Sequence, residues 1–224
     1  MRLSRYELSP QIGATAIGIR TNEGVVLAVE KKLPSVLMDP SSVEKLQEID
    51  THIGCASSGL GGDAKDLINH ARVECQSHRF SYNEPLSLEA VTQSVSDLAI
   101  NFGAEKKGSK KKKMSRPYGV SLLIAGIDEA GPALYQTDPS GTYLKWEARA
   151  IGSAAEGAQA YIQESYQADM SLEEAKKLAM QTLKNVMEEK INKYNVEMCT
   201  ISTADSKYNV YTPVQIDEII NGLS

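Results

Sequence analysis

The chain has 224 residues, of which 42% are hydrophobic and 24% are charged, proportions typical of a globular protein rather than a disordered or fibrous one. Its 29 acidic residues outnumber 24 Lys and Arg, so the net charge is −5 and nucleic-acid binding, which needs a basic surface, is not expected. The most apolar stretch, 118–127, is shorter than the roughly 20 residues of a membrane span, and three widely spaced cysteines without an apolar leader predict a reducing, intracellular setting.

The first predicted elements are two pairs of strands. Alternating side chains over 14–20, a turn at 21–24 and a second run over 25–30 predict a β-hairpin. Residues 44–50 and 53–57, after a polar loop with two prolines, predict a second strand pair. The chain therefore begins with four strands.

Two amphipathic helices come next. Asp63 precedes a row of apolar residues at helical spacing and is predicted to cap that helix. Ser87 is predicted to start the second helix, whose apolar side runs from Leu88 to Phe102. The opposite face of each helix is polar, so both helices need a partner surface, most simply a sheet.

The second half of the chain repeats this order. Residues 120–127 are apolar on both faces, as in a central strand. The elements that follow are, in chain order, strands over 133–137, 142–146 and 148–151, helices from Ala154 and Ser171, strands over 196–202 and 208–211, and a helix from Thr212. Ser171 with Glu174, and Thr212 with Gln215, have the spacing of a capping box.

The order ββββ–αα–ββββ–αα–ββ–α predicts an α+β fold. Hairpins favour antiparallel sheets, and helices in pairs argue against a doubly wound parallel sheet, in which strands and helices alternate. A four-layer αββα sandwich of two antiparallel sheets would bury every apolar stripe. No linker-like stretch divides the chain, so residues 13–224 are expected to form a single domain after a short segment, 1–12.

The glycine-rich turn at 58–63 has two interpretations. Backbone N–H groups at a helix N-terminus can bind phosphate. The turn lacks the spacing of a P-loop or a dinucleotide-binding motif, however, and it places Asp63 where an anion would bind. A tight turn with a helix cap is the favoured interpretation.

No metal or cofactor is expected. The three histidines, His52, His70 and His78, lack the spacing of a zinc site, and no Ser-His-Asp arrangement is evident. A Lys-rich loop is expected at 104–115; it could be a nuclear-localisation or anion-binding patch, but a solvated loop is favoured because clustered lysines repel one another.

Several motifs nevertheless occur in the order of one known family. They are GATAIGI at 13–19, GVVLAVEKK at 24–32, SSVEKL at 41–46, SSGL at 57–60, RPYGV at 116–120, DPSG at 138–141 and AIGS at 150–153. In these motifs the chain resembles the alpha subunits of the 20S proteasome core, and 114–117, 154–159 and 186–190 resemble one eukaryotic type in particular. The resemblance implies the αββα sandwich of N-terminal nucleophile hydrolases, in agreement with the predicted element order.

This fold can be a protease or a scaffold. In the related catalytic beta subunits, a Thr exposed by cleavage behind a Gly attacks the peptide carbonyl. Here Ala14 follows Gly13, and Thr15 must point to the opposite face of its strand, so no catalytic residue and no hydrolase activity are expected. Glu30 and Lys45 resemble the acid and lysine that flank a catalytic Thr. The alternative is an independent N-terminal nucleophile amidohydrolase, which would have to expose a Thr, Ser or Cys by processing.

The resemblance implies a non-catalytic alpha-ring subunit with a structural and gating role in ubiquitin-dependent protein degradation, in the cytoplasm and nucleus. Its implied partners are other alpha subunits in a seven-membered ring, beta subunits and regulatory particles or activators, with no membrane. Lys45 resembles the lysine that meets the C-terminal carboxylate of an activator tail, and Gly59 the glycine that closes against this tail. An ion pair of Lys45 with Glu30, or an exposed strand lysine, is the alternative.

The segment 1–12 is shorter than its counterpart in most family members. Residues 4–7 and 9–10 resemble only parts of the family's gating tail, and the N-terminal helix that follows it is expected to be absent. Because this helix supplies packing surface in the ring, weaker or altered self-assembly is expected.

Overall fold

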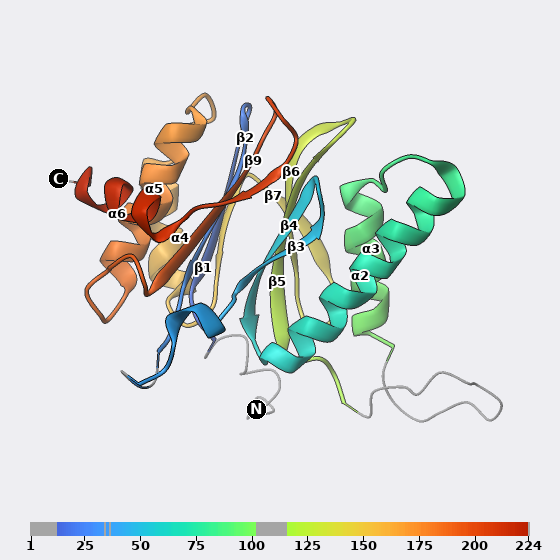
Figure 1. The fold of residues 1–224 in the computed structure, drawn as a ribbon, viewed down its shortest axis with the longest axis horizontal. Coiled ribbons are helices and arrows are strands. Elements are labelled where there is room, and N and C mark those ends of the chain that lie inside the picture. Colours follow the sequence, from blue (N-terminus) through green and yellow to red (C-terminus); the bar gives the residue numbers. More distant parts are fainter. Residues whose placement is uncertain (1–12, 34, 36, 102–115, 224) are drawn as a thin grey trace.

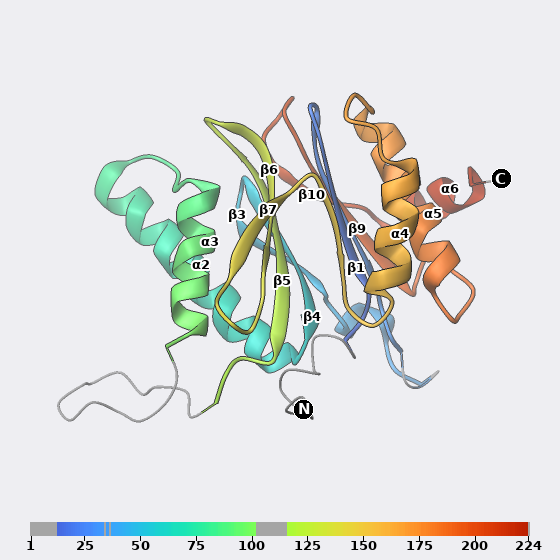
Figure 2. The same cartoon turned by 180° about the vertical axis from the view of Figure 1, so that it is seen from behind.

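The computed structural model of the chain describes residues 13–33, 35, 37–101 and 116–223, so the predicted segment 1–12 and the Lys-rich loop at 104–115 lie outside the described residues. Two five-stranded antiparallel sheets pack face to face, and helices cover both outer faces (Figure 1). The same four layers are seen from behind in Figure 2. The predicted four-layer αββα sandwich is confirmed.

The first sheet contains, in spatial order, β10 (Tyr208–Val210), β9 (Val196–Ser202), β2 (Gly24–Glu30), β1 (Ala16–Thr21) and β8 (Ala148–Ile151). The second contains β3 (Leu46–Asp50), β4 (Ile53–Gly59), β5 (Val120–Asp128), β6 (Gly131–Thr137) and β7 (Tyr143–Trp146). The strand pairs predicted as hairpins are paired in both sheets. A single residue, Glu147, separates β7 from β8, yet these strands belong to different sheets.

The helices cover the sheets in two groups. The first sheet is covered by α4 (Ala155–Ser165), α5 (Leu172–Val186) and α6 (Pro213–Asn221), and the second by α2 (Gly61–Tyr82) and α3 (Leu88–Ala99) (Figure 1). A short 3₁₀ turn, η1 (Pro40–Ser42), precedes β3. None of the helices in the described part of the chain is long and apolar enough to cross a membrane.

Three apolar layers hold the sandwich together, because central strands bury both faces. On β1, Ile17 packs towards α4 and α5, whereas Ala16 faces the space between the sheets. On β5, Leu123 lies between the sheets and Ile124 packs against α2 and α3. All of these side chains are buried, and each fully buried Ile or Leu contributes about 1.5–3 kcal/mol.

The helix starts confirm two predictions and correct a third. Ser171 with Glu174 and Thr212 with Gln215 form complete capping boxes at α5 and α6. The prediction that Asp63 caps its helix is wrong: α2 begins at Gly61, and no side chain caps it. The predicted helix at Ser87 is present but ends at Ala99, and Phe102 lies outside the described residues.

Candidate functional site

The position that a nucleophile would occupy lies just before β1 and is held by Ala14. Its side chain is a methyl group, and the residue is only 4% exposed. The Ala14 carbonyl accepts a hydrogen bond of 2.8 Å from Ser58 Oγ, and the Gly13 carbonyl accepts one of 2.9 Å from Ser153 N. The backbone is thus bound on both sides, and the nitrogen of residue 14 belongs to a peptide bond rather than to a free amine.

Two glycines make this tight packing possible. A Cβ on Gly13 would lie 2.4 Å from the backbone nitrogen of Gly59. A Cβ on Gly152, where φ is +101°, would lie 2.4 Å from the Ala14 carbonyl oxygen. Only glycine tolerates such an approach with a positive φ. The chain therefore encloses residue 14 in its own backbone.

Thr15, next to Ala14, has its side chain engaged within the chain. Its hydroxyl accepts a hydrogen bond of 3.4 Å from Ala154 N at the start of α4. Its backbone N–H donates to Glu30 Oε2 over 3.1 Å, and its carbonyl accepts from Glu30 N over 2.9 Å. Glu30 is therefore engaged by the backbone of Thr15.

The three cysteines are also unsuited to nucleophilic attack. Burial raises the pKa of both Cys55 and Cys75 to about 12, and it raises the pKa of Cys199 as well. All three side chains are free and buried. Because the thiolate is the nucleophile, these groups are unreactive near neutral pH.

The two predicted binding residues, Lys45 and Gly59, lie together at one end of the second sheet. Lys45 directly precedes β3, and its carbonyl accepts a hydrogen bond of 3.1 Å from Ser57 N. Gly59 ends β4 two residues further on and has a φ of +124°. Next to it, Leu60 is 38% exposed and adds an apolar surface. A lysine, a glycine backbone and an apolar side chain thus come from neighbouring segments.

The Lys45 ammonium has no partner within residues 13–33, 35, 37–101 and 116–223, where it makes neither a hydrogen bond nor an ion pair. The predicted alternative, an ion pair with Glu30, is absent from this part of the chain. Lys45 is half-buried. An ammonium without an internal partner is available to attract a carboxylate.

The glycine-rich turn is held by the carboxylate of Asp63. This carboxylate accepts hydrogen bonds of 2.6 and 2.8 Å from Arg116 and one of 2.7 Å from Gly119 N. Burial alone would raise the pKa of Asp63, but these hydrogen bonds outweigh it and hold the pKa below its ordinary value. The Gly119 carbonyl in turn accepts from Leu60 N over 3.0 Å. The geometry supports the tight-turn interpretation over a phosphate cradle, because a carboxylate already occupies the first turn of α2.

Glu197, on β9, is a residue that the sequence reasoning missed. Its Oε1 accepts a hydrogen bond of 2.9 Å from Lys31 Nζ. Its Oε2 accepts from the backbone nitrogens of Lys45 and Leu46, over 2.9 and 3.1 Å. A signal was present in the sequence, because Glu197 is the one charged residue of the strand VEMCTIS.

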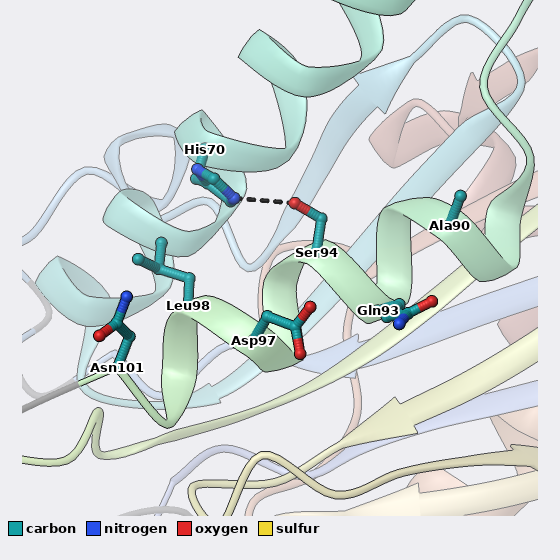
Figure 3. Close-up of a pocket in the computed structure, with 7 residues that line it drawn as sticks. All are labelled: His70, Ala90, Gln93, Ser94, Asp97, Leu98 and Asn101. Atoms are coloured by element: carbon teal, nitrogen blue, oxygen red, sulfur yellow. Dashed lines mark hydrogen bonds between the residues drawn. The ribbon is translucent and has the colours of Figure 1, made fainter.

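The three histidines lie apart, and each has its own partner. His52 Nε2 lies 3.0 Å from the Leu86 carbonyl, and His78 lies 3.4 Å from Glu84. His70 lines a hollow of about 650 Å³ between α2 and α3, where its Nε2 lies 2.9 Å from Ser94 Oγ (Figure 3). Among the described residues, no three His, Cys, Asp or Glu side chains are grouped so as to hold a metal ion.

Fold and site together define a class: a four-layer sandwich of the N-terminal nucleophile type with a methyl group in place of the nucleophile. Comparison with known proteins identifies the family. The model of the proteasome subunit family matches residues 11–201. The chain therefore belongs to the proteasome subunit family.

Several curated relatives are similar over nearly the whole chain. Proteasome subunit alpha type-5 of Dictyostelium discoideum is 50% identical over 222 residues, covering 99% of this chain and 92% of the relative. The alpha type-5 subunit of Drosophila melanogaster is 50% identical over 96% of this chain and 87% of its own length. The alpha type-5 subunit of Caenorhabditis elegans is 41% identical over 95% of this chain and 88% of its own length.

These matches, together with Ala14, make the chain a non-catalytic alpha subunit of the proteasome, which assembles with other proteasome subunits. An independent amidohydrolase is not favoured. The resemblance seen in the sequence motifs is thereby confirmed, including its likeness to one eukaryotic type of alpha subunit.

Proposed function

We propose that this chain is a structural and gating subunit of a seven-membered alpha ring in the 20S proteasome core. The ring would dock on a ring of beta subunits and receive regulatory particles in ubiquitin-dependent protein degradation, in the cytoplasm and nucleus. Support comes from relatives that are named proteasome subunit alpha type-5 and match over most of this chain.

Within the ring, Lys45 and Gly59 bind the C-terminal tail of an activator. The observation that carries this assignment is the ammonium of the half-buried residue Lys45, which has no partner within the described residues, on a segment at the same sheet end as Gly59. Three features suit the end of an extended peptide. The ammonium makes a charge-assisted hydrogen bond to the terminal carboxylate. Gly59 has no side chain to obstruct the peptide backbone, and Leu60 offers apolar contact.

The test uses assembled core particles that contain this subunit. A tail peptide with a photoreactive group next to its C-terminal carboxylate is cross-linked to the particles, and the yield on this chain is measured by mass spectrometry. Yields on the other subunits serve as an internal standard. Lys45→Ala is expected to lower the yield on this chain about tenfold, since a hydrogen bond to a charged group is worth about 1.5–3 kcal/mol.

A matched control and a C-terminally amidated peptide make the test specific. Lys177→Ala removes the same charge from the exposed face of α5 and is expected to leave the yield unchanged. The amidated peptide is expected to lose most of its cross-linking to the unaltered particle. Equal yields from Lys45→Ala and unaltered particles would refute the proposed site.

A further inference from the structure

Glu197 closes one end of the core between the two sheets. By strand alternation it shares a face of β9 with Cys199 and Ile201, which are buried between the sheets. Its carboxylate crosses from the first sheet to the second and binds the backbone where β3 begins. The Glu197 side chain is 17% exposed, and that of its partner Lys31 is 8% exposed. This is a largely desolvated contact, in which hydrogen bonds to charged groups are strong.

The backbone of Lys45 is held from both sheets. Its N–H donates to Glu197 of the first sheet, and its carbonyl accepts from Ser57 of the second. With both peptide groups fixed, the direction in which the Lys45 side chain leaves the backbone is fixed as well. A lysine side chain is long and flexible, so fixing its base lowers the ordering cost when it binds a ligand.

The charge of Glu197 needs a partner of its own. A carboxylate this close to the Lys45 backbone could pair with the Lys45 ammonium and block it. Lys31 prevents this, because its ammonium lies 2.9 Å from Glu197 Oε1. Lys31 is fixed in turn, since its backbone N–H donates to the Asn195 carbonyl over 2.7 Å. The Glu197 carboxylate thus binds the Lys45 backbone, and the Lys31 ammonium neutralises the charge of this carboxylate.

We propose that Glu197, neutralised by Lys31, is a positioning residue that keeps the Lys45 ammonium free for an incoming carboxylate. This inference rests on the proposed function of Lys45 and adds two residues that do not themselves contact the tail. It makes a specific prediction: removing the charge of Lys31 should harm carboxylate binding by releasing Glu197 to compete for the Lys45 ammonium.

The experiment uses assembled core particles and measures, for this chain, the ratio of cross-linking by the free-acid peptide to that by the amidated peptide. Lys31→Met is expected to lower this ratio about fivefold, the effect of about one hydrogen bond. Glu197→Gln in the same chain is expected to restore it, because the amide oxygen still accepts from the Lys45 and Leu46 nitrogens but carries no charge to compete.

The ratio separates positioning from general damage to the fold, which would lower capture of both peptides alike. If Lys31→Met particles do not assemble, Lys31→Gln serves instead, since it keeps a hydrogen-bond donor near Glu197 while removing the charge. An unchanged ratio in the Lys31 variants, combined with a lowered ratio in Lys45→Ala, would overturn the inference but leave the proposed function standing. An unchanged ratio in Lys45→Ala would overturn both.

Discussion

The start of β1 and the segment at Lys45 both lie beside the end of β4, yet their polar groups differ in how far they are satisfied. Around residue 14, carbonyls, an amide and the Glu30 carboxylate are bound within the chain, and glycines bring the backbone into contact. At Lys45 the backbone is bound equally well, but the ammonium has no partner in the described residues. Internal hydrogen bonds thus satisfy the polar groups around residue 14, whereas the Lys45 ammonium has no internal partner among the described residues.

The largest expected effect on stability comes from disturbing the backbone packing around residue 14. Gly152→Ala would place a Cβ 2.4 Å from the Ala14 oxygen at a φ of +101°. We expect it to lower the free energy of unfolding by about 3 kcal/mol, measured by urea denaturation of the purified chain. Gly61→Ala is the control, because a Cβ there meets nothing within 4 Å. Similar losses in the two variants would contradict the tight packing around residue 14.

A smaller effect is expected at the glycine-rich turn that follows Gly59. Asp63→Asn leaves Arg116 without its carboxylate and should cost about 2 kcal/mol near neutral pH. Because the pKa of Asp63 is lowered in the folded chain, its contribution to stability is present above the unfolded pKa of about 3.9 and is lost as pH falls through the lower folded pKa. The difference between Asp63→Asn and the parent should therefore shrink in acid. A difference independent of pH would argue against the ion pair.

Thr15→Ala tests whether the residues before β1 have any hydrolase activity. It removes the acceptor of a long hydrogen bond from Ala154 N, so we expect about 1 kcal/mol of lost stability. Neither the parent nor the variant should hydrolyse a fluorogenic peptide. Turnover by the pure parent chain that disappears in Thr15→Ala would contradict the non-catalytic assignment.

The smallest effect on stability is expected at Lys45 itself. Since its ammonium has no partner in the described residues, Lys45→Ala should change the free energy of unfolding by less than about 0.5 kcal/mol. A loss above about 1 kcal/mol in the purified chain would show that the ammonium supports the fold, and the contrast between the two regions would weaken.

Local patterns in the sequence were enough to predict the layers. Strand alternation with turn residues predicted the first hairpin, and capping spacing located the starts of α5 and α6. Contacts between distant segments could not be predicted. Asp63 was predicted to be a helix cap because it precedes a helical pattern. Its partner, Arg116, is 53 positions away, so no local pattern indicated the ion pair. The passage of the chain from the second sheet to the first at Glu147 could not be predicted locally either, because β8 belongs to the first sheet through its pairing with β1.

The same contrast between local patterns and distant contacts applies to the predicted site. Lys45 and Gly59 are predicted as binding residues by resemblance to a family, and strand register explains why they lie at the same end of the sheet, since Leu46 lies opposite Ala56. Glu197 was missed because its partners lie about 150 positions earlier in the chain. Its one local signal was a charge in a buried strand, which usually requires a buried partner.

The most direct test is a structure of the assembled particle with an activator tail bound. We predict that an oxygen of the terminal carboxylate lies about 2.8 Å from Lys45 Nζ, with the tail backbone against Gly59. A Lys45 ammonium paired instead with an acidic side chain of a neighbouring subunit, with the tail bound elsewhere, would contradict the account.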